Sequence, residues 1–532
     1  MKKAIKYIFL VFLIPLVSCS QDLLNLNNPN VPTTATFWKN TSDLQLGLTS
    51  TYSQFTRRGN WGRWIYFRYD LTSDEGFSNS PWTELKNWTQ FLYTNYNFVE
   101  GNSLVYKSHY KQIFEANQVI YYGNLIKSTS ATDSLLKNKI IAQAKFIRAF
   151  DYFNLIILFG NGEIVLNPSK PGDVYPMGTS DQLYQIAIND LNEAIVDLPE
   201  VWTAGDKGRV TKGAAYALLG KIYMQQHQWQ KAKDAFNWLV EGAGAKYYGL
   251  MDKYSDNFSH LTENNKESVF EIQFSDANQT PTDMANGSLL DDDISTMNVG
   301  NTRSQFMGLR GKGWCDGQPR SWLVAEYKRE LTQTGTIDDR LKSSMFYPDI
   351  FKDNPGITFY LGSVKKWNAA WGKECFFRKY TDEYFKSNID YYSPINYRII
   401  RYADVLLCYA ECIANLGDVP SAAAYVDRVR NRTSTNLPKL QNSLVPEIAD
   451  CLSSNEKFLK RLQMERALEL SFESVRWIDI KRWGLLDTQE GINELLLRDP
   501  DFQNYTIGKN QVMPLPQTEI DNNKNLTQNA NY

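Results

Sequence analysis

The chain of 532 residues has little histidine, with only His109, His227 and His260, which are scattered far apart. Histidine is the usual general base and a common zinc ligand, so this scarcity argues against Ser-His or Cys-His relays and His-rich metal sites. A surplus of one charge is also lacking, because 57 basic and 59 acidic residues leave a net charge of −2. Without a basic surplus no overall field holds a nucleic-acid backbone, and we expect no nucleic acid among the partners.

Cysteine is sparse as well, and the six residues show no CxxC spacing that would indicate a zinc site. Cys408 and Cys412 lie one helical turn apart, where side-chain directions suit a disulfide badly, so we expect buried thiols. The run Asp291-Asp292-Asp293 lacks the spacing of an EF-hand. We therefore predict no metal site and no cofactor.

The apolar run Ile8–Val17 is too short to span a bilayer, but it follows three lysines and has the length of a signal-peptide core. It ends in Leu-Val-Ser-Cys, with the cysteine at position 19, which resembles the bacterial lipobox. We expect residues 1–18 to be a signal peptide and Cys19 to be acylated. Residues 19–36, rich in Asn and Pro, are then an extended lipidated tether.

Apolar residues recur at helical spacing over 104–242 and 397–484. Within the second block, Tyr397–Arg432 reads as two short helices. Gly417 supplies the left-handed residue that ends the first helix, and Asp418 with Pro420 suits the start of the second.

The segment 211–242 matches part of the tetratricopeptide spacing, with Gly220 and Ala232 twelve residues apart. Ala410 and Ala422 repeat that separation. Because one short helix pair cannot bury both of its apolar faces, further pairs must stack beside it. The sequence predicts a mostly α fold, in which tetratricopeptide-like helical pairs form a scaffold, with few short strands such as 269–274.

Two segments, 57–98 and 275–394, interrupt the helical pattern and carry many of the 14 Trp, 31 Tyr and 27 Phe residues. We predict that they are loop-rich, ligand-facing regions held by the helical scaffold. No strong linker separates them from the helices, so residues 37–532 are predicted to form a single domain.

Several motifs resemble the SusD/RagB family, the lipoproteins that Bacteroidetes-type bacteria display on their outer membrane. They are DLLNLNNPNVPTTATFWKNTSDLQLGLTSTY at Asp22–Tyr52, FIRAFDYFNL, RYADVLLCYAE, ERALELSFESVRWIDIKRWG at Glu465–Gly484, MPLPQTEI and NLTQNANY. Ser474 stands where the family usually has glycine. The resemblance implies a glycan-binding lipoprotein of the outer membrane that captures oligosaccharides for a SusC-like TonB-dependent transporter.

Sugar binding needs flat aromatic faces beside Asp, Asn or Arg side chains, and both irregular segments supply them. Family members tend to build their sugar sites from these two regions. The candidate ligand-binding residues are Asp70, Asp74, Trp82 and Trp88 in the first segment and Trp314, Cys315, Asp316 and Arg378 in the second.

Three other functions stay open. One is an oligopeptide receptor of the RagB kind, and another is an assembly scaffold without a small ligand. The third is a glycoside hydrolase that uses the carboxylates of Asp74 and Glu75 or of Asp338 and Asp339, although adjacent carboxylates do not normally flank a glycosidic bond. We expect a binding protein, not an enzyme.

Overall fold

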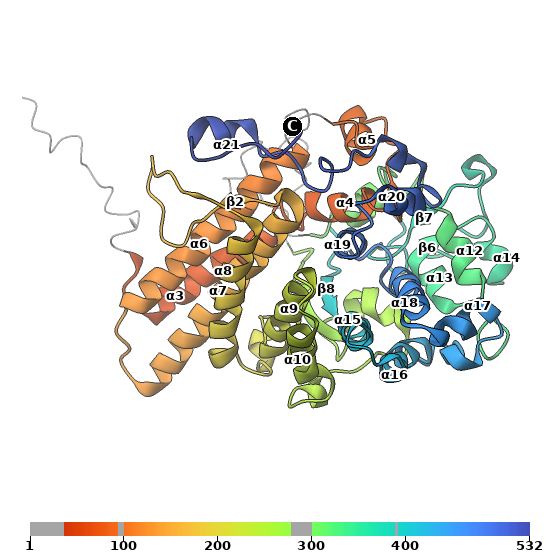
Figure 1. Ribbon diagram of the computed structural model, residues 1–532, viewed down its shortest axis with the longest axis horizontal. Helices are drawn as coiled ribbons and strands as arrows, with labels where there is room; N and C mark the ends of the chain where they lie inside the picture. Colours follow the sequence, from red (N-terminus) through yellow and green to blue (C-terminus); the bar gives the residue numbers. More distant parts are fainter. Residues whose placement is uncertain (1–36, 94–99, 278–299, 389–391) are drawn as a thin grey trace, which may run out of the picture.

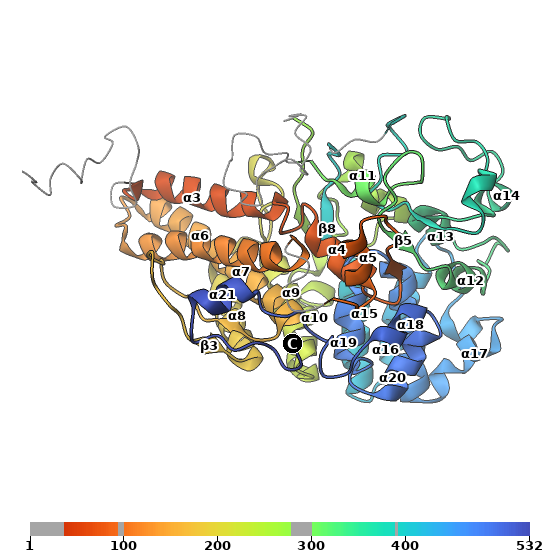
Figure 2. The same cartoon turned by 90° about the horizontal axis from the view of Figure 1, so that it is seen from above.

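The computed structural model describes residues 37–93, 100–277, 300–388 and 392–532. The predicted signal peptide, the lipidation site Cys19 and the run Asp291–Asp293 lie outside these residues. Over the described residues the protein is mostly helical with few short strands, as the sequence predicts (Figures 1 and 2).

Four helices make up one half of the molecule, at the left of Figure 1. They are α3 (Thr41–Ser53), α6 (Val105–Leu125), α7 (Ala131–Phe159) and α8 (Ser180–Asp197). Helix α7 packs against the other three, and almost every residue from Ile140 to Phe159 is buried. A helix that is buried on all sides belongs in a core, which explains why most residues of this stretch are apolar. Gly160, at φ +76°, follows its last turn.

The predicted helical pairs are α9 (Lys212–Gln225) with α10 (Trp229–Val240) and α15 (Tyr402–Asn415) with α16 (Val419–Arg430). Helix α10 also packs on α15, so the two pairs stack. Gly417 takes φ +95° just after α15, and the Asp418 side chain accepts a hydrogen bond from the amide of Ser421 at 3.1 Å. Both helix-end predictions are confirmed. A methyl group at Gly220 would lie 2.7 Å from the ring of Phe236, so α9 and α10 need this glycine.

One five-residue strand pair joins the scaffold to the rest of the chain. Strand β4 (Ser268–Ile272) runs antiparallel to β8 (Tyr397–Arg401). The predicted strand at 269–274 is thus confirmed within two residues. The start of the Tyr397–Arg432 stretch, however, is β8 and not helix, because its backbone pairs with β4. The other antiparallel pairs are two-residue strands: β1 (Gly76–Phe77) with β5 (Gln318–Pro319), β2 (Gly162–Glu163) with β3 (Met177–Gly178), and β6 (Met345–Phe346) with β7 (Phe376–Phe377).

The prediction that 57–98 is a loop region needs correction, because it contains the helices α4 (Trp64–Leu71) and α5 (Thr83–Thr89). Every residue of α4 is buried. A short helix surrounded on all sides carries apolar residues without helical spacing, so it leaves no periodic signal. The segment 275–394 is irregular as predicted, but it includes α11 (Arg303–Met307), α12 (Trp322–Lys328), α13 (Asp339–Ser344) and α14 (Ile350–Asp353).

Helix α18 (Asn455–Leu470) ties the irregular segments to the helical pairs through buried ion pairs. The Glu465 carboxylate lies 2.8 Å from Arg340 of α13 and 2.9 Å from Arg430 of α16. Glu469 lies 2.6 Å from Arg432. Removing one partner of a buried ion pair leaves the other charge uncompensated. These contacts therefore hold the irregular segments against the helical pairs. Helix α18 lies in the half of the molecule opposite α3, α6, α7 and α8 (Figure 1). In Figure 2, α11 and α14 lie along one edge of this second half, and α16 and α20 (Gln489–Leu496) lie along the other.

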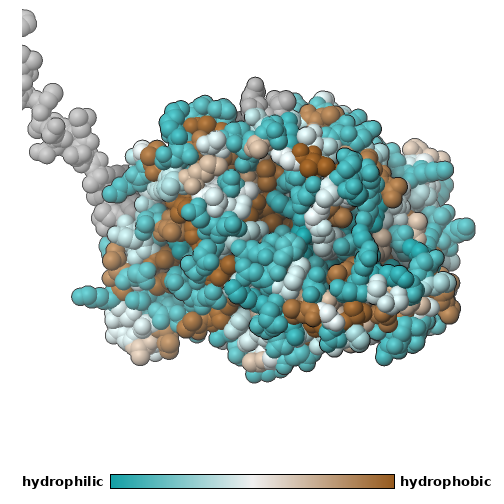
Figure 3. Space-filling model, in the orientation of Figure 1, coloured by the Kyte–Doolittle hydropathy of each residue, from teal (hydrophilic) through white to brown (hydrophobic). Residues whose placement is uncertain are grey.

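The C-terminal segment returns to the first half of the molecule. After α17 (Pro446–Ala449) and α19 (Arg476–Arg482), the chain ends with α21 (Gln517–Asn522), which lies beside α6 in both ribbon views. Lys107 and Glu519 pair there at 3.3 Å. The face in Figure 3 mixes hydrophilic and hydrophobic residues. Among the helices described, none combines the length and the apolar character needed to cross a bilayer.

Candidate functional site

The two irregular segments meet at a short antiparallel pairing. Gly76 of β1 lies opposite Pro319 of β5, and Phe77 lies opposite Gln318. The pairing brings the stretch that carries Trp82 next to the stretch that carries Trp314. Residues more than 200 positions apart in the chain therefore form one surface.

Serine hydroxyls fix the relative position of the two stretches. Ser78 donates to the main-chain carbonyl of Asp316 at 2.6 Å, and Ser80 donates to its carboxylate at 2.5 Å. The amide of Trp82 in turn donates to the Ser80 hydroxyl at 3.1 Å. Burial raises the pKa of the Asp316 carboxyl, although the Ser80 hydrogen bond opposes the shift. Asp316 thus holds Trp82 in place through Ser80.

The buried rings of Trp64 and Phe306 continue this contact toward Trp314. The Trp82 ring meets Trp64 edge-on at 5.4 Å, and the Trp314 ring meets Phe306 edge-on at 5.1 Å. The Arg63 guanidinium lies between these pairs, 4.2 Å from the centre of Phe306 and 5.9 Å from that of Trp64. Trp314 is 49% exposed, which fits its glycine-rich loop, and Trp82 is half-buried. We call this region, formed by Arg63, Ser80, Trp82, Phe306, Trp314 and Asp316, the loop face; Trp82 and Trp314 reach solvent, and the other four residues are buried beneath them.

Sequence reasoning missed Arg63, Ser80 and Phe306 of the loop face. The one signal for Arg63 was its place between Trp61 and Trp64, and Ser80 precedes Pro81-Trp82 in a polar turn. Nothing local indicated Phe306, because it is buried and meets Arg63 only through the contact of the two segments.

Three predicted ligand residues lie in the interior instead, which corrects those expectations. Trp88 is about 1% exposed. Asp70 pairs with Arg303 at 2.8 Å, and Asp74 pairs with Arg476 at 2.7 Å. Burial raises the pKa of Asp70, whereas at Asp74 the arginines outweigh burial and lower the pKa. The arginine partners of Asp70 and Asp74 are distant in the chain, so the residues around each Asp in the sequence do not predict these pairs.

The interior carboxylates clamp the turn between α18 and α19. Asp70 accepts a hydrogen bond from the amide of Ser474 at 2.8 Å, and Glu75 accepts one from the amide of Phe472 at 3.2 Å. Phe472 and Ser474 both adopt positive φ, +61° and +60°. Ser474 therefore takes the left-handed conformation that a glycine would adopt more easily.

Cys315 and Arg378 are also placed away from the exposed rings. Cys315 is buried at φ +59°, and burial raises the pKa of its thiol to about 12. The Arg378 guanidinium pairs with Glu383 at 2.7 Å and lines a cavity of about 310 Å³ together with Asp339 and Tyr384. The structure thus brings Trp82, Trp314 and Asp316 together, and it does not bring Arg378 to them through any cavity lining or hydrogen bond described.

The carboxylate pairs weighed for hydrolysis are engaged in structural contacts. Asp338 pairs with Arg340 at 2.8 Å, as Asp74 does with Arg476. Burial raises the pKa of Glu75 well above its usual value. Within the described ranges, no three His, Cys, Asp or Glu side chains are grouped to hold a metal ion.

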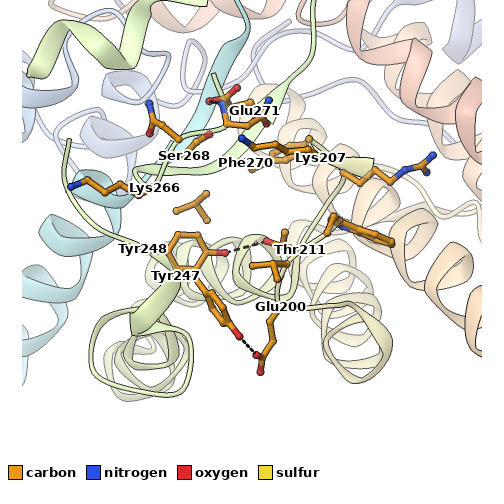
Figure 4. Close-up of a pocket in the computed structure, with 16 residues that line it drawn as sticks. Glu200, Lys207, Thr211, Tyr247, Tyr248, Lys266, Ser268, Phe270 and Glu271 are labelled. Carbon is orange, nitrogen blue, oxygen red and sulfur yellow. Dashed lines mark hydrogen bonds between the residues drawn. The ribbon is translucent and has the colours of Figure 1, made fainter. Parts of the chain in front are cut away.

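Another cavity, of about 290 Å³, lies beside strand β4 (Figure 4). Phe270 and Glu271 lie on its upper side in this view, and Tyr248 and Thr211 lie below. The Tyr248 and Thr211 hydroxyls are 3.2 Å apart, so one donates a hydrogen bond to the other.

Comparison with known proteins gives matches along most of the chain. The family described as "SusD family" matches residues 266–532, and the one described as "Starch-binding associating with outer membrane" matches residues 60–224. A SusD-like protein P2 of Formosa agariphila is 27% identical over 549 residues, 99% of each chain. The name of this relative does not specify a ligand.

Solved structures of similar fold cover nearly the whole chain. A SusD superfamily protein of Bacteroides vulgatus matches with a TM-score of 0.78 at 25% identity, over 93% of this chain and 100% of that one. A surface glycan-binding protein A of Bacteroides thetaiotaomicron, in complex with laminarihexaose, matches with a TM-score of 0.70 at 21% identity, over 92% and 99%.

Proposed function

Because the chain belongs to the SusD family, we propose that it is a glycan-binding protein that captures oligosaccharides on its loop face. The observation that carries the proposal is the exposed indole of Trp314, held edge-on by Phe306. Sugar rings present C–H patches that stack on such faces, and the buried Asp316 and Arg63 hold the rings in position from below. A relative of the same fold is in complex with laminarihexaose, which supports the ligand class.

We further propose that the protein is a lipoprotein of the outer membrane, acylated at Cys19 and facing the cell exterior. Residues 19–36 then tether a single domain, 37–532. The description of one matching family as associating with the outer membrane supports this location. From there the protein delivers bound oligosaccharides to a SusC-like TonB-dependent transporter. It acts without cleaving the glycan; in support, Asp74 and Asp338 are engaged with arginines and Glu75 is buried.

Isothermal titration of the purified chain against laminarihexaose, maltoheptaose, cellohexaose and a peptide pool tests the proposal. We expect at least one oligosaccharide to bind and Trp314→Ala to weaken that binding roughly tenfold or more. Covering the exposed half of an indole removes on the order of 100 Å² from water, which contributes about 2 kcal/mol.

Trp202→Ala is the matched control, because Trp202 lines the cavity of Figure 4 and not the loop face. It should leave oligosaccharide affinity unchanged. Binding of peptides alone would replace the proposal with an oligopeptide receptor, and release of shorter sugars from the oligosaccharides would replace it with a hydrolase. If neither oligosaccharides nor peptides bind, the proposal is replaced by an assembly scaffold without a small ligand.

A further inference from the structure

A second cavity lined by tryptophan lies in the helical scaffold, where several helices end. Its volume is about 330 Å³. Trp229 is the first residue of α10, Asn415 is the last residue of α15, Gln463 belongs to α18, and Trp483 follows α19. We call it the helix cavity. None of its lining residues belongs to the loop face.

The Trp483 ring is fixed before any ligand arrives. Its indole nitrogen donates to the Glu411 carboxylate at 2.9 Å, and that carboxylate pairs with Arg482 at 2.7 Å. The Arg476 guanidinium lies 5.4 Å from the ring centre. A half-buried indole held in this way offers a flat apolar surface at little cost in side-chain entropy.

The Trp229 ring is positioned by the turn between α9 and α10. His227 adopts φ +54° in this turn, and its ring meets Trp229 edge-on at 5.2 Å. Trp229 is half-buried, while His227 and Asp487 on the cavity wall are exposed. The helix cavity is therefore open to solvent, with one indole contributed by each of two helix ends.

Polar groups beside the indoles have unused hydrogen-bonding capacity. The Asn415 amide donates to the main-chain carbonyl of Glu411 at 2.8 Å, which leaves its side-chain oxygen as an acceptor. For the side chain of Gln463, the described part of the chain provides no hydrogen-bond partner. An amide both donates and accepts, as a sugar hydroxyl does, so the two groups can pair with hydroxyls in either sense.

The charges around the helix cavity are balanced. Glu411 pairs with Arg482, and the Lys481 ammonium donates to the main-chain carbonyls of Ile157 at 2.9 Å and Gln511 at 3.2 Å. Lys481 and Arg482 are therefore engaged with groups of the protein itself, which disfavours a carboxylate or sulfate as the ligand. The chemistry fits an uncharged, hydroxyl-rich ligand with apolar C–H faces.

We propose that the helix cavity is a second saccharide site, which binds an uncharged sugar unit between Trp229 and Trp483. The inference takes its ligand class from the proposed function, but it uses different residues. Two sites on one chain would hold a long glycan at two points, so that dissociation from one site leaves the other engaged.

Titration and fluorine NMR of the full chain, purified in detergent and labelled with 5-fluorotryptophan, test the inference. The probes are laminarihexaose, maltoheptaose and cellohexaose at up to millimolar concentration. We expect one of them to occupy two sites per chain and to shift the resonances of Trp229 and Trp483, assigned from Trp229→Phe and Trp483→Phe. Trp229→Ala should remove the helix-cavity site and leave the loop-face site. Trp314→Ala should remove the loop-face site and leave the helix-cavity site.

Two further variants separate binding from folding. Gln463→Ala keeps both indoles and should weaken the helix-cavity site roughly fivefold, the loss expected for one hydrogen bond. Trp238→Ala is the control on the same helix, since its ring stacks on Tyr216 at 5.0 Å and does not line the cavity. It should leave both sites intact.

The outcomes distinguish this inference from the proposed function. A single site that Trp314→Ala removes, with the Trp229 and Trp483 resonances unmoved, overturns the helix-cavity site and supports the loop face. A single site that only Trp229→Ala removes supports the helix-cavity site and overturns the loop face as the binding surface. If no probe shifts any tryptophan resonance, both proposals are overturned.

Discussion

Glu267 offers a direct measure of how much the buried ion pairs contribute to stability. Its carboxylate lies 2.6 Å from Arg401 and 2.6 Å from Arg432, and it accepts a hydrogen bond from the amide of Met251 at 2.7 Å. Burial alone would raise the pKa of Glu267, but the two arginines outweigh it and lower the pKa from 4.5 to about 2. We predict that Glu267→Gln strongly destabilises the protein at neutral pH.

The expected magnitude follows from linkage between protonation and folding. A carboxyl whose pKa falls by about 2.5 units on folding contributes about 3 kcal/mol, at about 1.4 kcal/mol per unit. Because the pKa is lower in the folded state, this stability is present above pH 4.5 and is lost as the pH falls toward 2. At pH 3 only about 1 to 1.5 kcal/mol of it remains. The difference between wild type and Glu267→Gln should therefore shrink by about 2 kcal/mol from pH 7 to pH 3.

Urea unfolding followed by tryptophan fluorescence at both pH values measures this difference. Glu447→Gln is the control, because the Glu447 side chain is 71% exposed and lies 3.4 Å from Arg329 at the surface. Such pairs contribute little, so this variant should match wild type at both pH values. Equal losses for Glu267→Gln at pH 7 and pH 3 would refute the reasoning, since the cost would not then depend on the carboxylate charge.

Three further predictions concern a strained turn, a close helix contact and the loop face. Ser474→Gly should be more stable than Ser474→Ala by about 1 kcal/mol in urea unfolding, because both lose the hydroxyl and only glycine relieves the positive φ; equal stability would show that the turn is unstrained. Gly220→Ala should cost about 1 to 3 kcal/mol by the same assay, because the methyl group would press on the buried ring of Phe236; a neutral result would mean that the helices separate freely. Ser80→Ala should weaken oligosaccharide binding several-fold in titration and lower the free energy of unfolding by about 1 to 3 kcal/mol, since the buried hydroxyl links Asp316 to the backbone of the loop face; unchanged affinity would contradict that role.

Features set by neighbouring residues were predictable from the sequence. Gly417 and Asp418 mark the end of one helix and the start of the next through backbone conformation and a local side-chain hydrogen bond, and both were predicted at the right positions. The apolar spacing of α9 and α10 likewise indicated a helix pair. These signals need no knowledge of distant residues.

Features that depend on distant partners were not predictable in this way. Asp70 and Asp74 resemble sugar ligands in the sequence, yet their arginine partners Arg303 and Arg476 lie more than 200 residues away. Glu465 on α18 belongs to a charged segment whose burial depends on Arg340 and Arg430. Burial of a charge becomes visible only when the opposite charge has been placed beside it.

Placing the predicted site residues required the same long-range information. Trp314 is exposed on a loop where glycines lie close to it in the sequence. Trp88 was not distinguishable from Trp82 by composition, since both lie in one aromatic-rich stretch, and only the packing of α4 and α5 separates a core indole from a surface one.

The serine bridges from Ser78 and Ser80 to Asp316 have a consequence for protein engineering. A chimera that imports only residues 76–82 from a relative would set foreign side chains against the native 314–319 stretch, and the reverse exchange would do the same. Donor and recipient match only when both stretches are exchanged together. For grafting the loop face between members of this family, the exchangeable module is this discontinuous pair and not either loop by itself.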